Sequence, residues 1–187
     1  MSDRSVVVLV EGASDQAALE TLAKRRGRDL KAEGVSIVAM GGSSPVGDFL
    51  ERFSKTDLIL AGLCDEGEVG DFQRGLERAG FGADLSMADM ESLGFFVCKV
   101  DLEDELIRGL GSDAVQDVIE NEGELRSFRA LQNMPHWRQG PVDAQLRRFM
   151  GSQSGRKLRY GGLLVDALDL SNVPRPLDSV LAWTSRR

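Results

Sequence analysis

The sequence predicts an α/β fold built on a parallel four-stranded β-sheet with helices on both of its faces. Four short apolar segments, rich in branched residues, alternate with segments of helical periodicity. Strands that are apolar along their whole length are typical of parallel sheets, because helices bury both faces of such a sheet. The predicted strands are Val6–Val10, Val35–Met40, Leu58–Leu63 and Phe95–Val100.

The segments that connect the strands carry start and stop signals of helices. Ser14 can cap a helix that runs to about Arg26 and ends at Gly27. Pro45 suits the first turn of a helix that reaches Phe53, since the N–H that proline lacks would be unpaired there. Two further helices are predicted at residues 69–79 and 87–93, which completes a β-α-β-α-β-α-β order.

The chain beyond the fourth strand is predicted to be helical. We therefore expect a sheet domain at residues 1–111 and an α-helical, net-basic C-terminal extension at residues 112–187 that packs on it. Met134–Trp137 interrupts the helical pattern, and Asn172–Pro176 is expected to be an extended linker. The better-defined helices of the extension are Val142–Met150, Leu158–Leu168 and a final short one at Leu177–Trp183.

The charge of the chain is divided unevenly along its length. The net charge of −7 argues against a nucleic-acid partner at first sight. Residues 1–124, however, carry 12 basic and 26 acidic side chains (12 − 26 = −14), and residues 125–187 carry 11 and 4 (11 − 4 = +7). This asymmetry is either chance surface charge or a basic surface joined to an acidic domain.

Composition indicates a cytoplasmic protein with a packed core. Hydrophobic residues make up 42% of the chain, and we find neither an apolar run of membrane-spanning length nor a signal-peptide core. We therefore expect no membrane partner. Cys64 and Cys98, the two cysteines, lie in apolar segments and are expected to be buried free thiols. Two cysteines and one histidine are too few ligands for a structural zinc module.

Acidic residues follow three of the four predicted strands. The carboxyl ends of parallel strands meet at one edge of a sheet, which is where ligands bind in open α/β folds. Clustered carboxylates repel one another, and a divalent cation between them removes that penalty. Oxygen ligands favour Mg²⁺, with Mn²⁺ as a substitute, and one or two ions are compatible with the pattern. The candidate metal ligands are Glu11, Asp15, Asp65, Glu68, Asp101 and Glu103.

The segment Val10-Glu11-Gly12-Ala13-Ser14-Asp15 resembles the first motif of the Toprim domain. Together with Asp101-Leu102-Glu103-Asp104-Glu105-Leu106, it is most similar to the Toprim domain of the OLD (overcoming lysogenisation defect) nucleases. The resemblance covers roughly residues 4–110 and implies a Rossmann-like Toprim sheet. It also implies Mg²⁺-dependent phosphodiester hydrolysis or nucleotidyl transfer on DNA, with Glu11 as a catalytic residue. Toprim domains of this branch use a lysine further along the chain, for which Lys157 is the expected counterpart, neutralising charge in the transition state.

The second Toprim motif, Asp-x-Asp, is incomplete in this sequence. Asp65 supplies its first acid, but Gly67 stands where the second is expected and Glu68 follows one residue later. Glu68 either replaces that ligand with a longer side chain or is the exposed start of a helix, where an acid is favoured without any metal. Asp15 and Asp101 have similar structural alternatives, in a first helical turn and as a helix cap.

Candidate nucleic-acid contacts come mainly from the basic extension. Gly41 and Gly42 either form a plain left-handed turn or let a phosphate approach the backbone N–H groups. Arginines near Lys157 are expected to contact the nucleic-acid backbone and to make binding salt-dependent. They are Arg147, Arg148, Arg156 and Arg159.

Two alternatives to a DNA nuclease remain open. OLD proteins also carry an ATPase domain, and residues 151–157, the nearest approach to a P-loop here, have the wrong spacing. The incomplete Asp-x-Asp motif therefore also fits a catalytically weak Toprim module that acts through a partner such as a separately encoded ATPase. The second alternative is an RNA-processing Toprim nuclease. The oligomeric state is not indicated by the sequence.

Overall fold

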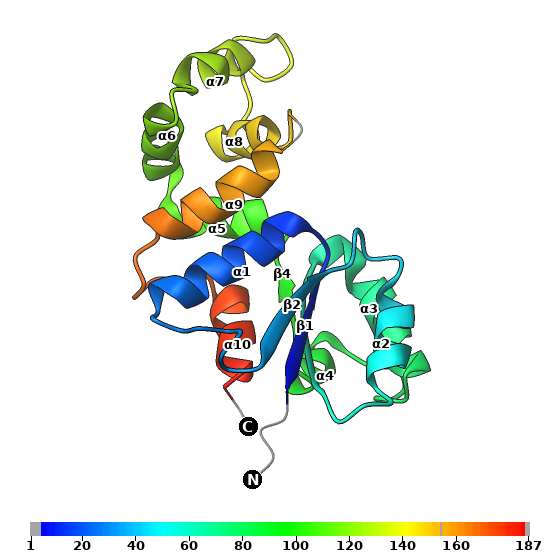
Figure 1. Cartoon of the computed structure of the whole chain (residues 1–187). Helices are drawn as coiled ribbons and strands as arrows, with labels where there is room; N and C mark the ends of the chain where they lie inside the picture. The colour runs from blue at the N-terminus through cyan, green and yellow to red at the C-terminus, as the bar shows by residue number, and fades with distance from the viewer. Residues whose placement is uncertain (1–4, 154, 186–187) are drawn as a thin grey trace.

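A computed structural model describes residues 5–153 and 155–185 (Figure 1). Four strands form one fully parallel sheet in the order β2-β1-β3-β4, which confirms the predicted α/β class. The sheet is narrow, and each strand is four to seven residues long. The strands are β1 (Val6–Val10), β2 (Val35–Ala39), β3 (Ile59–Asp65) and β4 (Phe95–Cys98).

Helices make up most of the remaining chain. Those of the sheet region are α1 (Ala13–Arg25), α2 (Val46–Phe53), the 3₁₀ turn η1 (Glu66–Glu68), α3 (Val69–Arg78), α4 (Met87–Ser92) and α5 (Leu102–Leu110). Those of the C-terminal part are α6 (Ser112–Asn121), α7 (Leu125–Gln132), α8 (Val142–Met150), α9 (Arg156–Ala167) and α10 (Arg175–Trp183).

The central strand β1 shows why the sheet needs helices on both faces. Its side chains alternate between two separate cores, because successive residues of a strand point to opposite faces. Val6, Val8 and Val10 lie in one core with residues of α1, α5, α9 and α10. Val7 and Leu9 lie in the other core with residues of α2, α3 and α4, which stand together beside the sheet in Figure 1.

The C-terminal helices pack directly on the sheet region and share the first of these cores. Helix α9 runs along α1, and an added Cβ at Gly161 would lie 2.8 Å from the carbonyl oxygen of Ser14. Helix α10 returns beside β4, where Trp183 leaves no room for a side chain at Gly94. The boundary that we expect after residue 111 stays a prediction, since residues from both sides of it contribute to one core.

Two helices of the C-terminal part begin two residues earlier than the sequence predicts. Helix α9 begins at Arg156, so Lys157 stands in its first turn. Helix α10 begins at Arg175, inside the segment that we expect to be an extended linker. Pro174 and Pro176 produced that expectation, but proline is accepted at the start of a helix, where its fixed φ is already suitable.

Two expectations drawn from composition can be compared with the structure directly. Cys64 and Cys98 are buried free thiols, as expected. Burial raises the pKa of both, which keeps them protonated. Across the described residues, every helix is too short or too polar to span a bilayer.

Candidate metal centre

Three carboxylates converge at the carboxyl edge of the sheet. Glu11 follows β1, Asp65 ends β3, and Glu68 closes the 3₁₀ turn that comes after it. One oxygen from each lies within 4.8 Å of the others. The sequence therefore identified residues that the fold brings together, and the structure places Glu68 at the cluster despite its shifted position in the motif.

The glycine pair Gly41-Gly42 holds the backbone of Glu11. Both glycines have positive φ, at 79° and 128°, and both of their N–H groups donate to the Glu11 carbonyl oxygen, at 2.9 and 3.0 Å. These N–H groups are thus engaged within the protein, as in a plain left-handed turn, which is one of the two alternatives that the sequence leaves open. The pair instead fixes the position from which the Glu11 side chain leaves β1.

Asp15 is buried beside this cluster and has a structural role of its own. Its carboxylate accepts a 2.9 Å hydrogen bond from the Gly12 N–H at the start of α1. Burial raises the pKa of Asp15 to about 6, and the neighbouring charges of Glu103 and Glu11 add to the effect. Asp15 is not one of the three convergent residues, so its part in holding a metal remains a prediction.

Burial and mutual repulsion disfavour the charged forms of the cluster. Burial, followed by the charge of Asp15, raises the pKa of Asp65 to about 7. Burial and the contact with Glu11 raise the pKa of Glu68 to about 8. A nearby cation stabilises such carboxylates, because it favours the charged form that burial and repulsion within the protein disfavour.

Asp101 lies next to the cluster but has a cationic partner. Its carboxylate caps α5 by accepting from the Asp104 N–H at 2.9 Å, and it forms a 2.5 Å ion pair with Arg147 of α8. The chain reaches Asp101 through Val100, a β-branched residue with φ of 68°, which is uncommon and strained. The structural alternative for Asp101, a helix cap, is therefore realised here, and an ion pair is added to it.

Glu103 and Lys157 form a second ion pair at the same edge. The Lys157 ammonium lies 2.9 Å from Glu103 Oε2. Burial alone would lower the pKa of Lys157, but the charge and hydrogen bond of Glu103, with Asp101 and Asp65 further away, raise it overall. The lysine therefore stays charged beside the acidic edge, and its role as the counterpart of the OLD Toprim lysine stays a prediction.

The donor set at the edge fits a divalent metal. Glu11, Asp65 and Glu68 offer hard oxygen ligands, and Glu68 Oε2 is buried with no hydrogen-bond partner among the described residues. Within that same part of the chain, no lysine or arginine forms an ion pair with any of the three. A buried carboxylate oxygen without a partner is costly unless a cation binds there.

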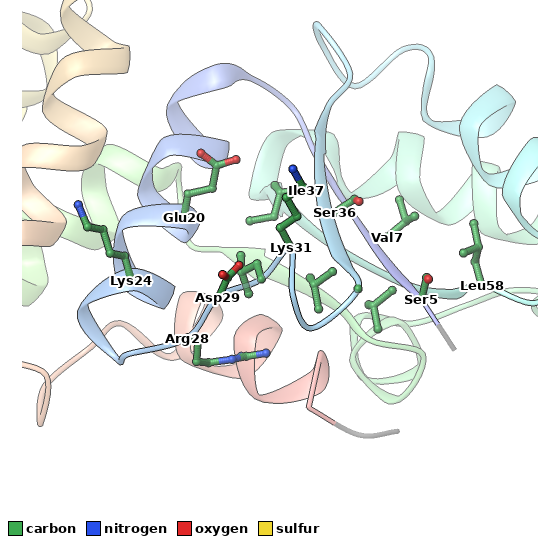
Figure 2. A pocket seen from close by; sticks show the side chains of 14 residues that line it. Ser5, Val7, Glu20, Lys24, Arg28, Asp29, Lys31, Ser36, Ile37 and Leu58 are labelled. Carbon is green, nitrogen blue, oxygen red and sulfur yellow. The ribbon is translucent and has the colours of Figure 1, made fainter. Parts of the chain in front are cut away.

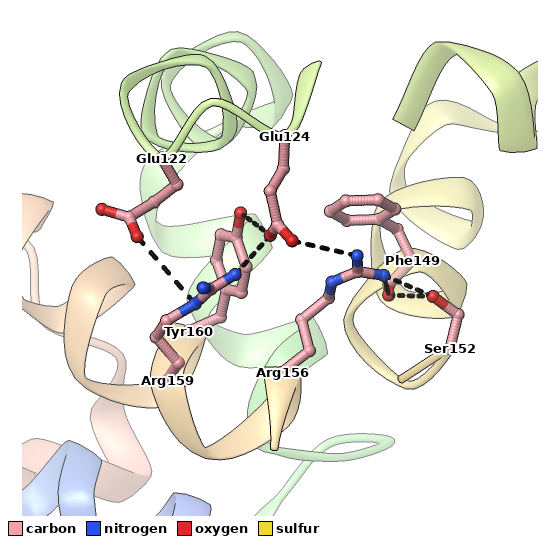
Figure 3. Close-up of polar contacts among 7 residues, drawn as sticks. All are labelled: Glu122, Glu124, Phe149, Ser152, Arg156, Arg159 and Tyr160. Atoms are coloured by element: carbon pink, nitrogen blue, oxygen red, sulfur yellow. Dashed lines mark hydrogen bonds and ion pairs between the residues drawn. The ribbon is translucent and has the colours of Figure 1, made fainter. Parts of the chain in front are cut away.

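Arg156 occupies a different environment from the one expected for a nucleic-acid contact. It is only 4% exposed and donates to the Phe149 carbonyl and Ser152 Oγ, at 3.1 and 2.6 Å (Figure 3). Its guanidinium also lies 3.1 Å from Glu124 and 3.9 Å from the centre of the Phe149 ring. The placement makes Arg156 a structural residue that fixes the start of α9, next to Lys157.

Glu124 is the centre of this second polar cluster. Besides Arg156, it accepts from the Tyr160 hydroxyl at 2.8 Å and pairs with Arg159 at 2.5 Å (Figure 3). These donors outweigh the effect of burial and lower the pKa of Glu124. Tyr160 is thereby a packed residue. The sequence offered no signal for Glu124, because its partners lie more than 30 positions away.

A large hollow of the surface is remote from the acids. It has a volume of about 860 Å³ and lies at the amino ends of β1 and β2, between Ser5, Ser36 and the end of α1 (Figure 2). Lys24 and Lys31 stand at its rim. Because the metal candidates lie at the opposite ends of the parallel strands, this hollow is no part of the candidate metal centre.

The parallel sheet with acids at its carboxyl edge is the arrangement that the resemblance to Toprim domains implies. Residues 5–66 match the family model described as "Overcoming lysogenization defect protein-like, TOPRIM domain". That match, over about a third of the chain, confirms the resemblance carried by the segment around Glu11. Toprim domains typically bind divalent metal, and Glu11 and Asp65 of the acidic cluster lie within the matched residues. No curated protein sequence matches the chain.

Solved structures extend the likeness in fold to the whole chain. The C-terminal region of the Xanthomonas campestris pv. campestris OLD protein superposes with a TM-score of 0.72 at 19% identity, covering 98% of this chain and 96% of that one. The C-terminal region of the Burkholderia pseudomallei OLD protein gives 0.72 at 18% identity, covering 96% of each chain. The protein thus has the fold of an OLD C-terminal region, including the helices after the sheet.

Proposed function

We propose that this protein is a divalent-metal-dependent phosphodiesterase that cleaves DNA. The observation that carries the proposal is the convergence of Glu11, Asp65 and Glu68 at the carboxyl edge of the sheet, where no described lysine or arginine forms an ion pair with them. A divalent ion bound there supplies Lewis-acid activation of a phosphodiester and stabilises the charge that develops on it. Mg²⁺ is the expected ion and Mn²⁺ a substitute, because all donors are carboxylate oxygens.

The residues around the cluster have separate roles in this proposal. Glu11, Asp65 and Glu68 hold the ion, and the N–H groups of Gly41 and Gly42 keep Glu11 in place. The Lys157 ammonium, now 2.9 Å from Glu103, is close enough to the edge to neutralise charge on the reacting phosphate. Asp15, Asp101 and Glu103 contribute to the negative field that attracts the ion.

We assign the contact with the nucleic-acid backbone to fewer arginines than the sequence indicates. Arg147 and Arg148 are exposed on α8, beside the edge where Lys157 lies. Arg156 is buried, and Arg159 belongs with it to the separate cluster around Glu124, outside the hollow that Arg147, Arg148 and Lys157 line. Phosphate contacts are therefore assigned to Arg147 and Arg148, and binding should weaken as salt is raised.

The test is cleavage of supercoiled plasmid and single-stranded DNA by purified protein in EDTA, Mg²⁺ and Mn²⁺. We expect metal-dependent cleavage that Glu11→Gln lowers at least about 100-fold, since catalysis requires the ion that Glu11 holds. Glu20→Gln is the matched control, because it removes an exposed acid from α1, outside the cluster. Equal metal-dependent cleavage by Glu11→Gln and the wild type would overturn the assignment.

Two other outcomes would move the protein to another class. Cleavage of structured RNA but not of DNA would identify the RNA-processing alternative. Metal binding without cleavage of any substrate, by protein shown to be folded, would favour the module that acts through a separately encoded ATPase. The incomplete Asp-x-Asp motif at Asp65 and Gly67 is the observation that keeps this last alternative in view.

A further inference from the structure

Two adjoining hollows lie beside the candidate metal centre, and Trp137 and Arg148 line both of them. The first has a volume of about 370 Å³ and is also lined by Asp101, Arg147 and Lys157. The second, of about 350 Å³, lies against the turns before α8 and α9. Each is within the size range of small-ligand sites. The first hollow shares Asp101 and Lys157 with the acidic edge, so a ligand that fills it would continue toward that edge.

Trp137 is held in place by its backbone. Gln145, which is buried in α8, donates to the carbonyl oxygens of Trp137 and Gly140, at 2.7 and 3.2 Å. The Trp137 N–H donates to the Met134 carbonyl at 2.9 Å, which closes the turn between α7 and α8. The indole is only partly buried. A partly exposed aromatic ring on a fixed backbone, at the wall of a hollow, is a suitable surface for a flat ligand.

The charges around the first hollow favour an anionic ligand. Asp101 is neutralised by Arg147 at 2.5 Å, and the charge of Lys157 is matched by Glu103 at 2.9 Å. Arg148 is exposed and forms no ion pair with any described residue. It is therefore a free positive charge beside Trp137, in the part of the chain whose net charge is +7 (11 − 4).

We propose that these hollows bind two consecutive nucleotides of an unpaired strand, with one base stacked on Trp137 and a phosphate held by Arg148. Aromatic stacking combined with basic side chains is the way in which proteins bind single-stranded nucleic acid without reading its sequence. A duplex keeps its bases stacked on one another and cannot offer a base to the indole. This assignment rests on the proposed function and names its substrate more closely: a single strand, or a duplex end or flap that supplies one.

Binding is measured apart from cleavage, by fluorescence anisotropy of labelled oligonucleotides in EDTA. Trp137→Ala should weaken binding of single-stranded oligothymidine about tenfold, which is the effect expected from losing one stacked base. Trp137→Phe should keep most of the affinity, since it retains an aromatic ring. Gln139→Ala, an exposed residue of the same turn, is the control and should bind as the wild type does. An abasic oligonucleotide should bind equally to the wild type and Trp137→Ala.

Arg148 is tested by the dependence of binding on salt. Arg148→Gln should reduce the slope of log affinity against log salt by about 0.7, the value for one phosphate contact on a single strand. Arg126→Gln removes an exposed charge from α7, outside both hollows, and should leave the slope unchanged.

The two proposals fail in different ways. Unchanged single-strand binding by folded Trp137→Ala would overturn the nucleotide site even if the wild type cleaves DNA. Failure of the wild type to bind any single strand at low salt would also overturn it. Stacking-dependent binding by a protein that cleaves nothing with any metal would keep the site and overturn the phosphodiesterase.

Discussion

The pKa values of carboxylates shift in opposite directions at the acidic edge of the sheet and in the cluster around Glu124. At the edge, burial and repulsion raise the pKa values of Asp15, Asp65 and Glu68 above their ordinary range. In the helical part, three donors around Glu124 lower its pKa. Both regions are polar and partly buried, so burial alone does not explain why the pKa values shift in opposite directions. The difference arises because hydrogen-bond donors compensate the charge of Glu124 and not the charges at the edge.

This difference separates a structural ion cluster from a candidate binding site. Glu124 makes its full set of interactions within the folded chain and needs no ligand. The edge carboxylates are left with an interaction that the protein does not supply, as the buried Glu68 Oε2 shows. Groups with strongly perturbed pKa values and unmet interactions are concentrated at functional sites. Three predictions follow from the contrast, in order of expected effect.

The largest change in stability is expected for Glu124→Gln. The substitution leaves Arg156 buried without its carboxylate, and breaking a pair of this kind costs about 3 kcal/mol. The melting temperature should fall by about 6 to 12 °C, which thermal unfolding followed by circular dichroism will measure. Glu122→Gln is the control, because Glu122 lies 3.9 Å from the exposed Arg159 and should change stability by less than about 0.5 kcal/mol. Equal effects of the two substitutions would contradict the structural role of Glu124.

A loss of stability with rising pH is expected at the acidic edge. Because Asp15, Asp65 and Glu68 have pKa values of about 6, 7 and 8 in the folded protein, the folded state holds more protons than the unfolded chain. The free energy of unfolding should therefore fall as pH rises from about 5 to 8 in EDTA. Saturating Mg²⁺ should reduce or reverse this fall, since the ion binds the deprotonated folded form.

Differential scanning calorimetry at several pH values measures both effects. Glu124, whose pKa is lowered, loses its contribution only under more acidic conditions and does not interfere in this window. A melting temperature in EDTA that is constant or rises between about pH 5 and 8 would show that the folded state does not raise the pKa values of the edge carboxylates.

The smallest effect is expected for Asp101→Asn, at the border between the two kinds of acid. Asparagine is an equally good helix cap, and the lost ion pair with the half-exposed Arg147 is worth less than about 1 kcal/mol. If Asp101 is structural, Mg²⁺ should raise the melting temperature of the variant as much as that of the wild type. If Mg²⁺ no longer raises the melting temperature of the variant, Asp101 is a metal ligand. An acid that is ion-paired within the protein could then also belong to the binding site.

Local patterns were sufficient to predict the sheet and the residues at its edge. The apolar β-branched segments, each followed by an acid or a glycine turn, fixed four parallel strands and placed Glu11 and Asp65 at their carboxyl ends. These features depend on neighbours in the sequence: a strand needs a short apolar run, and a parallel sheet gathers all strand ends at one edge. Glu68 was also recognisable as a candidate, although it is displaced in the motif, because it follows Asp65 by only a few positions in the sequence.

The tertiary structure decided which charged groups are paired and which are free. Nothing near Asp101 in the sequence indicates Arg147, and nothing near Arg156 indicates that Glu124 holds it inside the helical part. The N–H groups of Gly41 and Gly42 could face a phosphate or Glu11, and only the folded chain shows the latter. Pairing depends on distances between segments far apart in the chain, and those distances are set by how α8 and α9 pack on the sheet region, which no local pattern encodes.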